Sequence, residues 1–563
     1  MKHAVLLVVI ILLCSSCGQP RRILPRAGSK SNGGTLVLSI GSDPKSFNPV
    51  IAKETSTTAV TGYLFDGLTA TDGVTLEIKP ALAESWQHDA SGTIWTFHLR
   101  RNVRWHDGIP FTAADVVFTF NRLIFNPDIP TSSRDIFQIG DKPMAVEKLD
   151  DHTVRFILPK PFAPFLRLLG QEIMPKHVLE EAVAAQRFSS TWGINTPPRK
   201  IVGTGPFRMD EYRMGERIIF SRNPDYWKKD ADGNHLPYLD RIVLTIVADP
   251  NMALLKFRAG EIDAVTVRGQ DFAVLKPLEH KQNFTLWEIG PSLGSDFLIL
   301  NQSPTSKLPD VEKAWFSDRR FRQAIAHSID RQAVIRNVYA GFGIPQDGPL
   351  NTSYGFFYNP KIHRYPYNPA VARQLLQEAG FALRQGVLFD RTGKKVVFSL
   401  ITNSNNNERI QIGSIIQDDL KKLGITVNLL PLDFNTLVTK LTSTRDWEAV
   451  IIGLTGVIDP HGEKNVWHSS GQLHVWNPHP GNAATAWERE VDMLFERGAV
   501  ELDPAKRKQI YNRWQEIACE ELPFIYTANA TIMYAVRNKF EHLHPSVYGG
   551  IFHNIEEISI KQQ

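Results

Sequence analysis

One short motif has the residue types of a serine nucleophile. Gly290-Pro291-Ser292-Leu293-Gly294 satisfies the pattern Gly-X-Ser-X-Gly, which in hydrolases places the serine on a sharp turn between a strand and a helix. The residues from Phe284 to Ile289 predict the strand, but Ser295 to Leu300 predict a second strand where the helix is needed. We therefore expect no catalytic residue, and keep an exported hydrolase that uses Ser292 as an alternative.

A polar loop follows the apolar run from Ala449 to Ile452. Its imidazole and carboxylate side chains are those of His461, His468, His474, His479, Asp459 and Glu463. Imidazole binds nickel, copper and zinc, but histidine spacings of seven, six and five residues fit no ordinary metal motif. We expect no metal site, and interpret the histidines as loop residues that bond to backbone or water.

Nucleotide chemistry is not predicted. Gly203-Thr204-Gly205 begins like a dinucleotide-binding loop, but the next residues supply no third glycine and predict no helix. The sequence also lacks the Gly-X-X-X-X-Gly-Lys-Ser/Thr pattern of a phosphate-binding loop. We expect no cofactor, and any ATP-driven step must belong to a partner.

Length and charge exclude further classes. The 563 residues exceed one ordinary domain. Lys and Arg number 63 against 59 Asp and Glu, and the net charge of +4 is spread without a basic block. A nucleic-acid partner is therefore not expected.

The first 33 residues predict export. Ala4 to Leu13 is an apolar run of ten residues behind Lys2, too short to span a bilayer but typical of a secretory signal. Leu13-Cys14-Ser15-Ser16-Cys17 resembles a bacterial lipobox, with Cys14 where leucine is usual. We predict a signal peptide at 1–16, lipidation of Cys17, and a Pro- and Gly-containing tether at 17–33.

Past the tether, strands and helices alternate as in an α/β protein. Strands are predicted at Thr35–Ile40, at Ile94–Leu99 and after Gly424, where the sequence reads ITVNLL. Cap and stop residues predict helices from Thr112, from Pro369 to Gly380, from Asn407 to Leu423 and from Pro504. The second cysteine of the mature chain, Cys519, is predicted to be a small buried residue on the last of these helices.

Several segments resemble, in order, the signatures of one family, the extracellular solute-binding proteins of peptide and nickel ABC importers (family 5). They are Pro80–Trp86, residues 96–120 (TFHLRRNVRWHDGIPFTAADVVFTF), Val202–Trp227, Gly260–Asp263 and Phe321–Arg331.

This resemblance implies a type II periplasmic binding protein fold, in which two α/β lobes close on a ligand like a Venus flytrap. The predicted first lobe comprises residues 34–61, 201–295 and 503–563, the second comprises residues 296–502, and a domain is inserted in the first lobe at 62–200. Segments that cross between the lobes would form a hinge.

The resemblance also points to ligand-binding residues. The family has a Trp-Thr-Gly segment followed by an Asp that holds a peptide ammonium, and here Leu454, Thr455 and Gly456 are followed by Val457. Valine cannot stabilise an ammonium group, so either Asp459 or another acid binds the ligand cation, or the ligand has no free amino group at that point. The predicted ligand-binding residues are Gly453, Leu454, Thr455, Asp459, Trp467 and Trp476.

Together these features predict a monomeric lipoprotein of the periplasm or cell surface, anchored to a bacterial membrane. It would capture peptides or peptide-like solutes and deliver them to an ABC permease with separate ATPase subunits. A non-peptide ligand such as a nickel chelate, an opine or a sugar conjugate stays open, as does a receptor that serves a sensor protein instead of transport.

Overall fold

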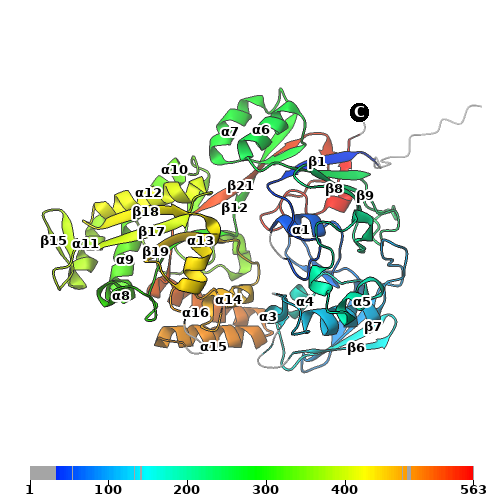
Figure 1. Cartoon of the computed structure of the whole chain (residues 1–563), viewed down its shortest axis with the longest axis horizontal. Coiled ribbons are helices and arrows are strands. Elements are labelled where there is room, and N and C mark those ends of the chain that lie inside the picture. Colours follow the sequence, from blue (N-terminus) through cyan, green and yellow to red (C-terminus); the bar gives the residue numbers. More distant parts are fainter. Residues whose placement is uncertain are drawn as a thin grey trace, which may run out of the picture.

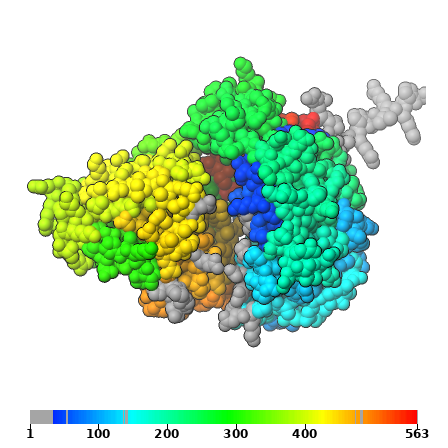
Figure 2. All heavy atoms as spheres, in the orientation of Figure 1, coloured from blue at the N-terminus to red at the C-terminus, as the bar shows by residue number. Residues whose placement is uncertain are grey.

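The alternation of strands and helices produces two α/β lobes that face each other across a hollow (Figures 1 and 2). The computed structural model describes residues 33–561 except 53–54, 132, 138, 140–142, 472 and 479–482. The predicted signal peptide, Cys17 and nearly all of the tether lie outside this part of the chain. None of the helices in it is long and apolar enough to cross a membrane.

The first lobe is built on a sheet with the strand order β1-β10-β9-β8. β1 is parallel to β10, and the other pairs are antiparallel. Alternate apolar side chains, such as Leu36 and Ile242, are buried in its core. The elements are β1 (Thr35–Ile40), α1 (Thr55–Thr61), β8 (Phe207–Arg213), β9 (Arg217–Arg222) and β10 (Arg241–Ile246).

The segment between α1 and β8 has a core of its own, around the antiparallel sheet β4-β5-β7-β6. Thr112 caps α2 with Asp115 in a capping box, as its sequence predicts. The elements are β2 (Thr69–Thr71), β3 (Ile78–Pro80), β4 (Ala83–His88), β5 (Ile94–Leu99), α2 (Ala113–Val117), α3 (Ser133–Phe137), β6 (Ala145–Asp150), β7 (Thr153–Ile157), α4 (Phe165–Leu168) and α5 (Lys176–Ala184).

The second lobe has the sheet order β18-β17-β19-β13-β20. β17 is parallel to β18 and β19, and β13 is antiparallel to β19 and β20. The strands are β13 (Ser295–Leu300), β17 (Val397–Asn403), β18 (Thr426–Leu432), β19 (Ala449–Leu454) and β20 (Phe524–Tyr526), with the small hairpin β15 (Ala382–Arg384) and β16 (Val387–Phe389) at the tip.

Helices cover this sheet. Asn368 caps α11 and Asp503 caps α16, both as predicted. α12 begins at Asn407, as predicted, and its cap is the preceding residue, Asn406. The helices are α8 (Asp310–Ser317), α9 (Arg319–Ser328), α10 (Arg331–Asn337), α11 (Pro369–Glu378), α12 (Asn407–Lys421), α13 (Phe434–Thr439), α14 (Lys464–Trp467), α15 (Ala486–Val500) and α16 (Pro504–Glu521).

Two strand connections join the lobes near α6 and α7, and we call them the hinge (Figure 1). β12 (Phe284–Pro291) leads into β13, and β20 leads into β21 (Ala528–Arg537), which pairs with β12. A bulge interrupts this pairing between Glu288 and Gly290. The remaining elements are α6 (Pro250–Ala259), β11 (Ala264–Thr266), α7 (Gly269–Leu275), β14 (Gly343–Pro345), β22 (Phe540–Glu541) and β23 (Ser559–Ile560).

The chain returns to the first lobe later than residue 503. Trp514 of α16 and Phe524 of β20 are buried in the same core as Phe297 of the second-lobe strand β13. The strand β21 then pairs with β11 and β12 on the first-lobe side. We therefore propose the domain limits predicted above, except that the chain returns to the first lobe at β21 instead of at residue 503.

Candidate functional site

The end of β19 presents an unpaired backbone edge. β17 pairs with β19 only at Ala449 and Val450, and the Thr402 hydroxyl donates to the Ile451 carbonyl at 3.0 Å. From Ile452 to Leu454, no strand of the described chain pairs with that edge, while β13 covers the other. An extended ligand can add to such an edge by main-chain hydrogen bonds. Gly453, Leu454 and Thr455 thus lie together at an edge suited to backbone recognition.

Gly453 is required by its surroundings. A Cβ atom there would lie 2.2 Å from Oδ1 of Asp296 and 2.6 Å from Nη2 of Arg409. The Arg409 guanidinium donates to Asp296 at 2.8 Å and to the Asn403 side chain at 3.1 Å. This polar group lies where β17 and β19 end, and ligands commonly bind at such strand ends. The sequence did not single out Asp296 and Arg409.

The Gly-X-Ser-X-Gly motif is part of the hinge. β13 follows Ser292 directly, so the helix that a nucleophile elbow needs is absent here. The Ser292 hydroxyl accepts a hydrogen bond from the Gly294 N–H at 3.0 Å. The backbone carbonyls of residues 291–294 accept hydrogen bonds from the side chains of Ser353, Asn351, Tyr354 and Asn529 respectively. The motif therefore builds a fixed connection between the lobes.

Asp459 is held by a partner within the chain. Both of its carboxylate oxygens accept hydrogen bonds from Arg507, at 2.6 and 2.7 Å, and only 14% of its side chain is exposed. Burial alone would raise the pKa of Asp459, but the hydrogen bonds and charge of Arg507 outweigh it and lower the pKa. Because the guanidinium occupies both oxygens, Asp459 is poorly placed to bind a ligand cation.

Trp467 and Trp476 lie in the core of the second lobe. Their exposed fractions are 1% and 0%, and their ring centroids are 5.5 Å apart. The Trp476 indole donates at 3.2 Å to Glu488, the residue that completes the capping box of α15 with the cap Thr485. Both side chains therefore pack the lobe and are not exposed on a cleft wall in this conformation.

The loop histidines have separate partners. His474 lies 3.4 Å from Glu488, His468 lies near Asp492, and His461 packs against Phe162. His479 lies outside the described residues. The described chain contains no group of three or more His, Cys, Asp or Glu side chains that could hold a metal ion.

The carboxylate of one acid in the segment after β19 has no ion pair or hydrogen bond among the described residues. Glu463 follows the loop that contains Val457, and burial raises its pKa to about 7. It is close enough to Tyr354 and Tyr526 to raise the pKa of both phenols, beside the larger effect of their burial. A cationic ligand group beside Glu463 would favour the ionised carboxylate.

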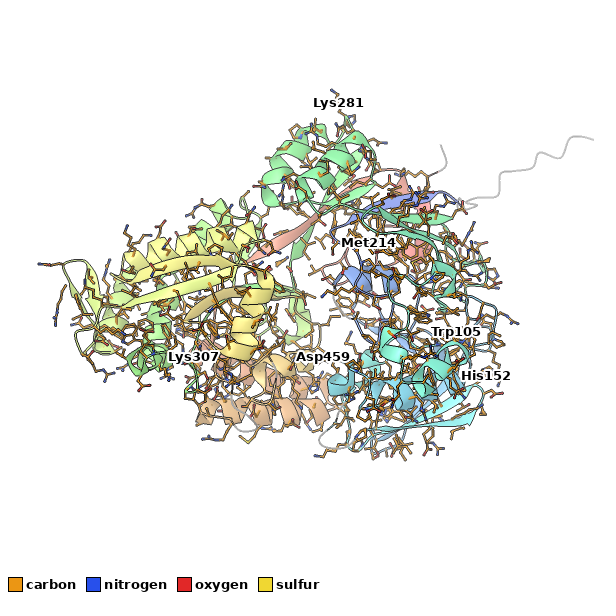
Figure 3. All side chains as sticks on the ribbon, viewed as in Figure 1. Trp105, His152, Met214, Lys281, Lys307 and Asp459 are labelled. Carbon is orange, nitrogen blue, oxygen red and sulfur yellow. The ribbon has the colours of Figure 1, made fainter. Side chains whose placement is uncertain are left out.

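A second contact joins the lobes far from the hinge (Figures 1 and 3). The Ala163 N–H donates to the Ala499 carbonyl at 2.8 Å, and the rings of Phe162 and His461 meet edge to face at 5.3 Å. We call these four residues the distal contact. Only tertiary placement reveals it, because apolar and aromatic residues at this separation give no sequence signal.

Asp459 and Arg507 support the distal contact from the second lobe. Asp459 lies two residues before His461 and accepts from its backbone N–H at 2.9 Å. Arg507 also donates to the carbonyl of Gly498, next to Ala499, at 2.8 Å. The ion pair therefore ties together the two second-lobe segments that reach the inserted domain.

Comparison with known proteins agrees with this architecture. Residues 77–473 match the family model described as bacterial extracellular solute-binding proteins, family 5 Middle. A probable ABC transporter-binding protein of Deinococcus radiodurans is 32% identical, over 91% of this chain and 89% of that protein. The oligopeptide-binding protein AppA of Bacillus subtilis is 27% identical, over 93% of this chain and 92% of that protein.

The structure of AppA from Bacillus subtilis in complex with a nonapeptide superposes with a TM-score of 0.77 and 26% identity, over 95% of this chain and 100% of that chain. The fold is therefore that of a type II periplasmic binding protein, as the resemblance implied. The chain belongs to the bacterial extracellular solute-binding proteins, family 5.

Proposed function

We propose that this protein is the receptor of an ABC importer and captures peptides or peptide-like solutes between its lobes. The observation that carries this proposal is the unpaired β19 edge from Ile452 to Leu454, which can bind any extended main chain regardless of its side chains. AppA, which shares the fold and 26% of the residues, was solved with a nonapeptide. The protein acts by non-covalent binding and performs no reaction.

In this proposal Gly453, Leu454 and Thr455 make the backbone contacts. Glu463 takes the role that we first assigned to Asp459, since Arg507 occupies Asp459 and no such partner is described for Glu463. Lobe closure follows binding because the closed state adds contacts that the open state lacks.

The membrane arrangement is also part of the proposal. Lipidated Cys17 would anchor the receptor as a monomer at the outer face of a bacterial membrane, within reach of the permease. The permease and its ATPase subunits recognise the closed, loaded receptor and provide the energy for import.

Native mass spectrometry of the chain from Gly18 onward, purified without refolding, tests the ligand class. Denaturing release of the bound material should yield a mixture of short peptides. A single non-peptide compound or a metal chelate would overturn the peptide assignment, and would favour the non-peptide receptor that the Val457 departure left open.

A further inference from the structure

A small cavity lies between the lobes beside the hinge. Its volume is about 170 Å³. Three parts of the chain meet there: the turn between β2 and β3, the hinge at Leu293 with the neighbouring second-lobe segments, and the turn at 546–548. The apolar lining comes from Val74, Leu76, Leu293, Tyr354, Ile458 and Val547.

Three of the polar side chains in this lining have hydrogen-bond partners within the chain. The Ser353 hydroxyl donates to the Pro291 carbonyl at 2.5 Å and the Tyr354 phenol donates to the Leu293 carbonyl at 3.1 Å. The Ser546 hydroxyl accepts from the Gly549 N–H at 2.8 Å. None of the described residues that line the cavity is charged. A charged occupant would therefore lose its water without gaining an ion pair, whereas an apolar occupant gives up no hydrogen bond and leaves water.

The position links the cavity to the β19 edge. Ile458 follows Thr455 by three residues on the same loop, and a Cβ on Gly456 would touch both the Leu293 carbonyl and the Tyr354 phenol. A ligand whose main chain lies along β19 can therefore direct a side chain into the cavity.

We propose that this cavity is a specificity subsite for one bulky apolar side chain of the solute, aliphatic or aromatic. The inference rests on the proposed function, since it takes a peptide-like ligand at the β19 edge. The cavity is large enough for one such side chain and too small for a second residue. Its walls come from both lobes, so filling it favours the closed state.

Calorimetry with tripeptides tests the subsite. Trialanine is compared with peptides in which Leu, Phe or Asp replaces each alanine in turn, using the full-length chain in detergent. At one position, Leu and Phe should bind about 10- to 100-fold tighter than Asp, as expected for burying one apolar side chain.

Val74→Asp is the matched variant, because Val74 lies at the cavity and is 55% exposed, so the fold should tolerate the change. It should abolish the preference for Leu and Phe. Val274→Asp on α7, where the valine is 50% exposed, is the control and should keep the preference. Ile458→Asp should act like Val74→Asp on a second wall.

The outcomes separate the two proposals. Peptides that bind with no apolar preference, or with a preference that Val74→Asp and Ile458→Asp leave intact, would overturn the subsite and keep the peptide receptor. If none of the tripeptides binds, the subsite as stated fails. The proposed function fails as well if native mass spectrometry releases no peptide from the purified chain.

Discussion

In the described part of the chain, the lobes are joined at the hinge and at the distal contact, and these two regions are built differently. At the hinge, two covalent crossings are fixed by side chains that donate to four successive backbone carbonyls. At the distal contact, one backbone hydrogen bond and one ring pair join the lobes without a covalent link. The two crossings keep the lobes linked in every state, whereas the distal contact can separate and form again. We therefore expect the cleft to open at the distal contact, with the lobes rotating about the hinge.

The largest effect is expected from breaking the support of the distal contact. Arg507→Met would leave Asp459 as a buried, unpaired carboxylate and should lower the free energy of unfolding by about 3–5 kcal/mol. Chemical denaturation measures this change.

The double variant Asp459→Asn with Arg507→Met is the control and should recover most of the loss, since it removes both charges. If Asp459→Asn abolished solute binding and left stability unchanged, Asp459 would be a ligand residue after all.

The second-largest effect is expected from acid, which should open the distal contact. Burial lowers the pKa of His461 from 6.5 to about 4, with Asp459 and Glu496 opposing this shift and Lys464 and Arg507 adding to it. An imidazole freed by opening regains its ordinary pKa, so the open state takes up a proton as the pH falls from about 6.5 to about 4. Closure should weaken by about 3 kcal/mol across this window.

The interlobe distance measured against pH tests this expectation. His461→Gln should remove the pH dependence, and the exposed residue His280 provides the control His280→Gln. His106 should not affect the distance, although burial also lowers its pKa to about 4, because it bonds to Gly203 and Gly205 within the first lobe. A pH response that survives His461→Gln would contradict this assignment.

A break at the hinge should cost stability without opening the cleft. Asn351→Ala removes the donor to the Ser292 carbonyl, and the lost bond should lower the free energy of unfolding by about 2 kcal/mol. The interlobe distance should stay unchanged. Opening of the lobes by this variant would mean that the hinge itself sets the cleft width.

The smallest effect is expected at the rim of the distal contact. Leu502 is 45% exposed and its Cδ1 lies 2.9 Å from where a Cβ of Gly92 would be. Leu502→Ser should change overall stability by only about 0.5 kcal/mol, yet shift the lobes toward the open state. Leu255 on α6 is also exposed and lies outside the distal contact. If Leu255→Ser shifted the interlobe distance equally, the effect of Leu502→Ser would not be specific.

The sequence predicted elements whose signals are local. β1 and β5 match their predicted bounds, and the residues Asn368 and Asp503 cap their helices. Cys519 is buried on α16, as predicted. Periodicity and capping depend on neighbours in the chain, so they are visible without the fold.

The chemistry of the site was harder to predict because it depends on distant partners. The sequence around Asp459 indicates a ligand-binding residue, but its ion-pair partner Arg507 is 48 residues away in the chain. Trp467 and Trp476 have side chains that suit either a core or a ligand wall, and only burial decides between them. The motif predicted that the backbone at Gly453 contacts the ligand. It did not predict that this strand edge is unpaired, because that depends on where β17 ends.

One distance measurement tests the central claim most directly. Spin labels at Met214→Cys in the first lobe and Leu383→Cys in the second, both at exposed positions, report the lobe separation by electron resonance. In the chain from Gly18 onward, the only native cysteine is the buried Cys519. We predict a broad distance distribution without solute that collapses to one short distance when the peptides identified by mass spectrometry are added. A distribution that stays unchanged at saturating peptide would contradict capture by lobe closure.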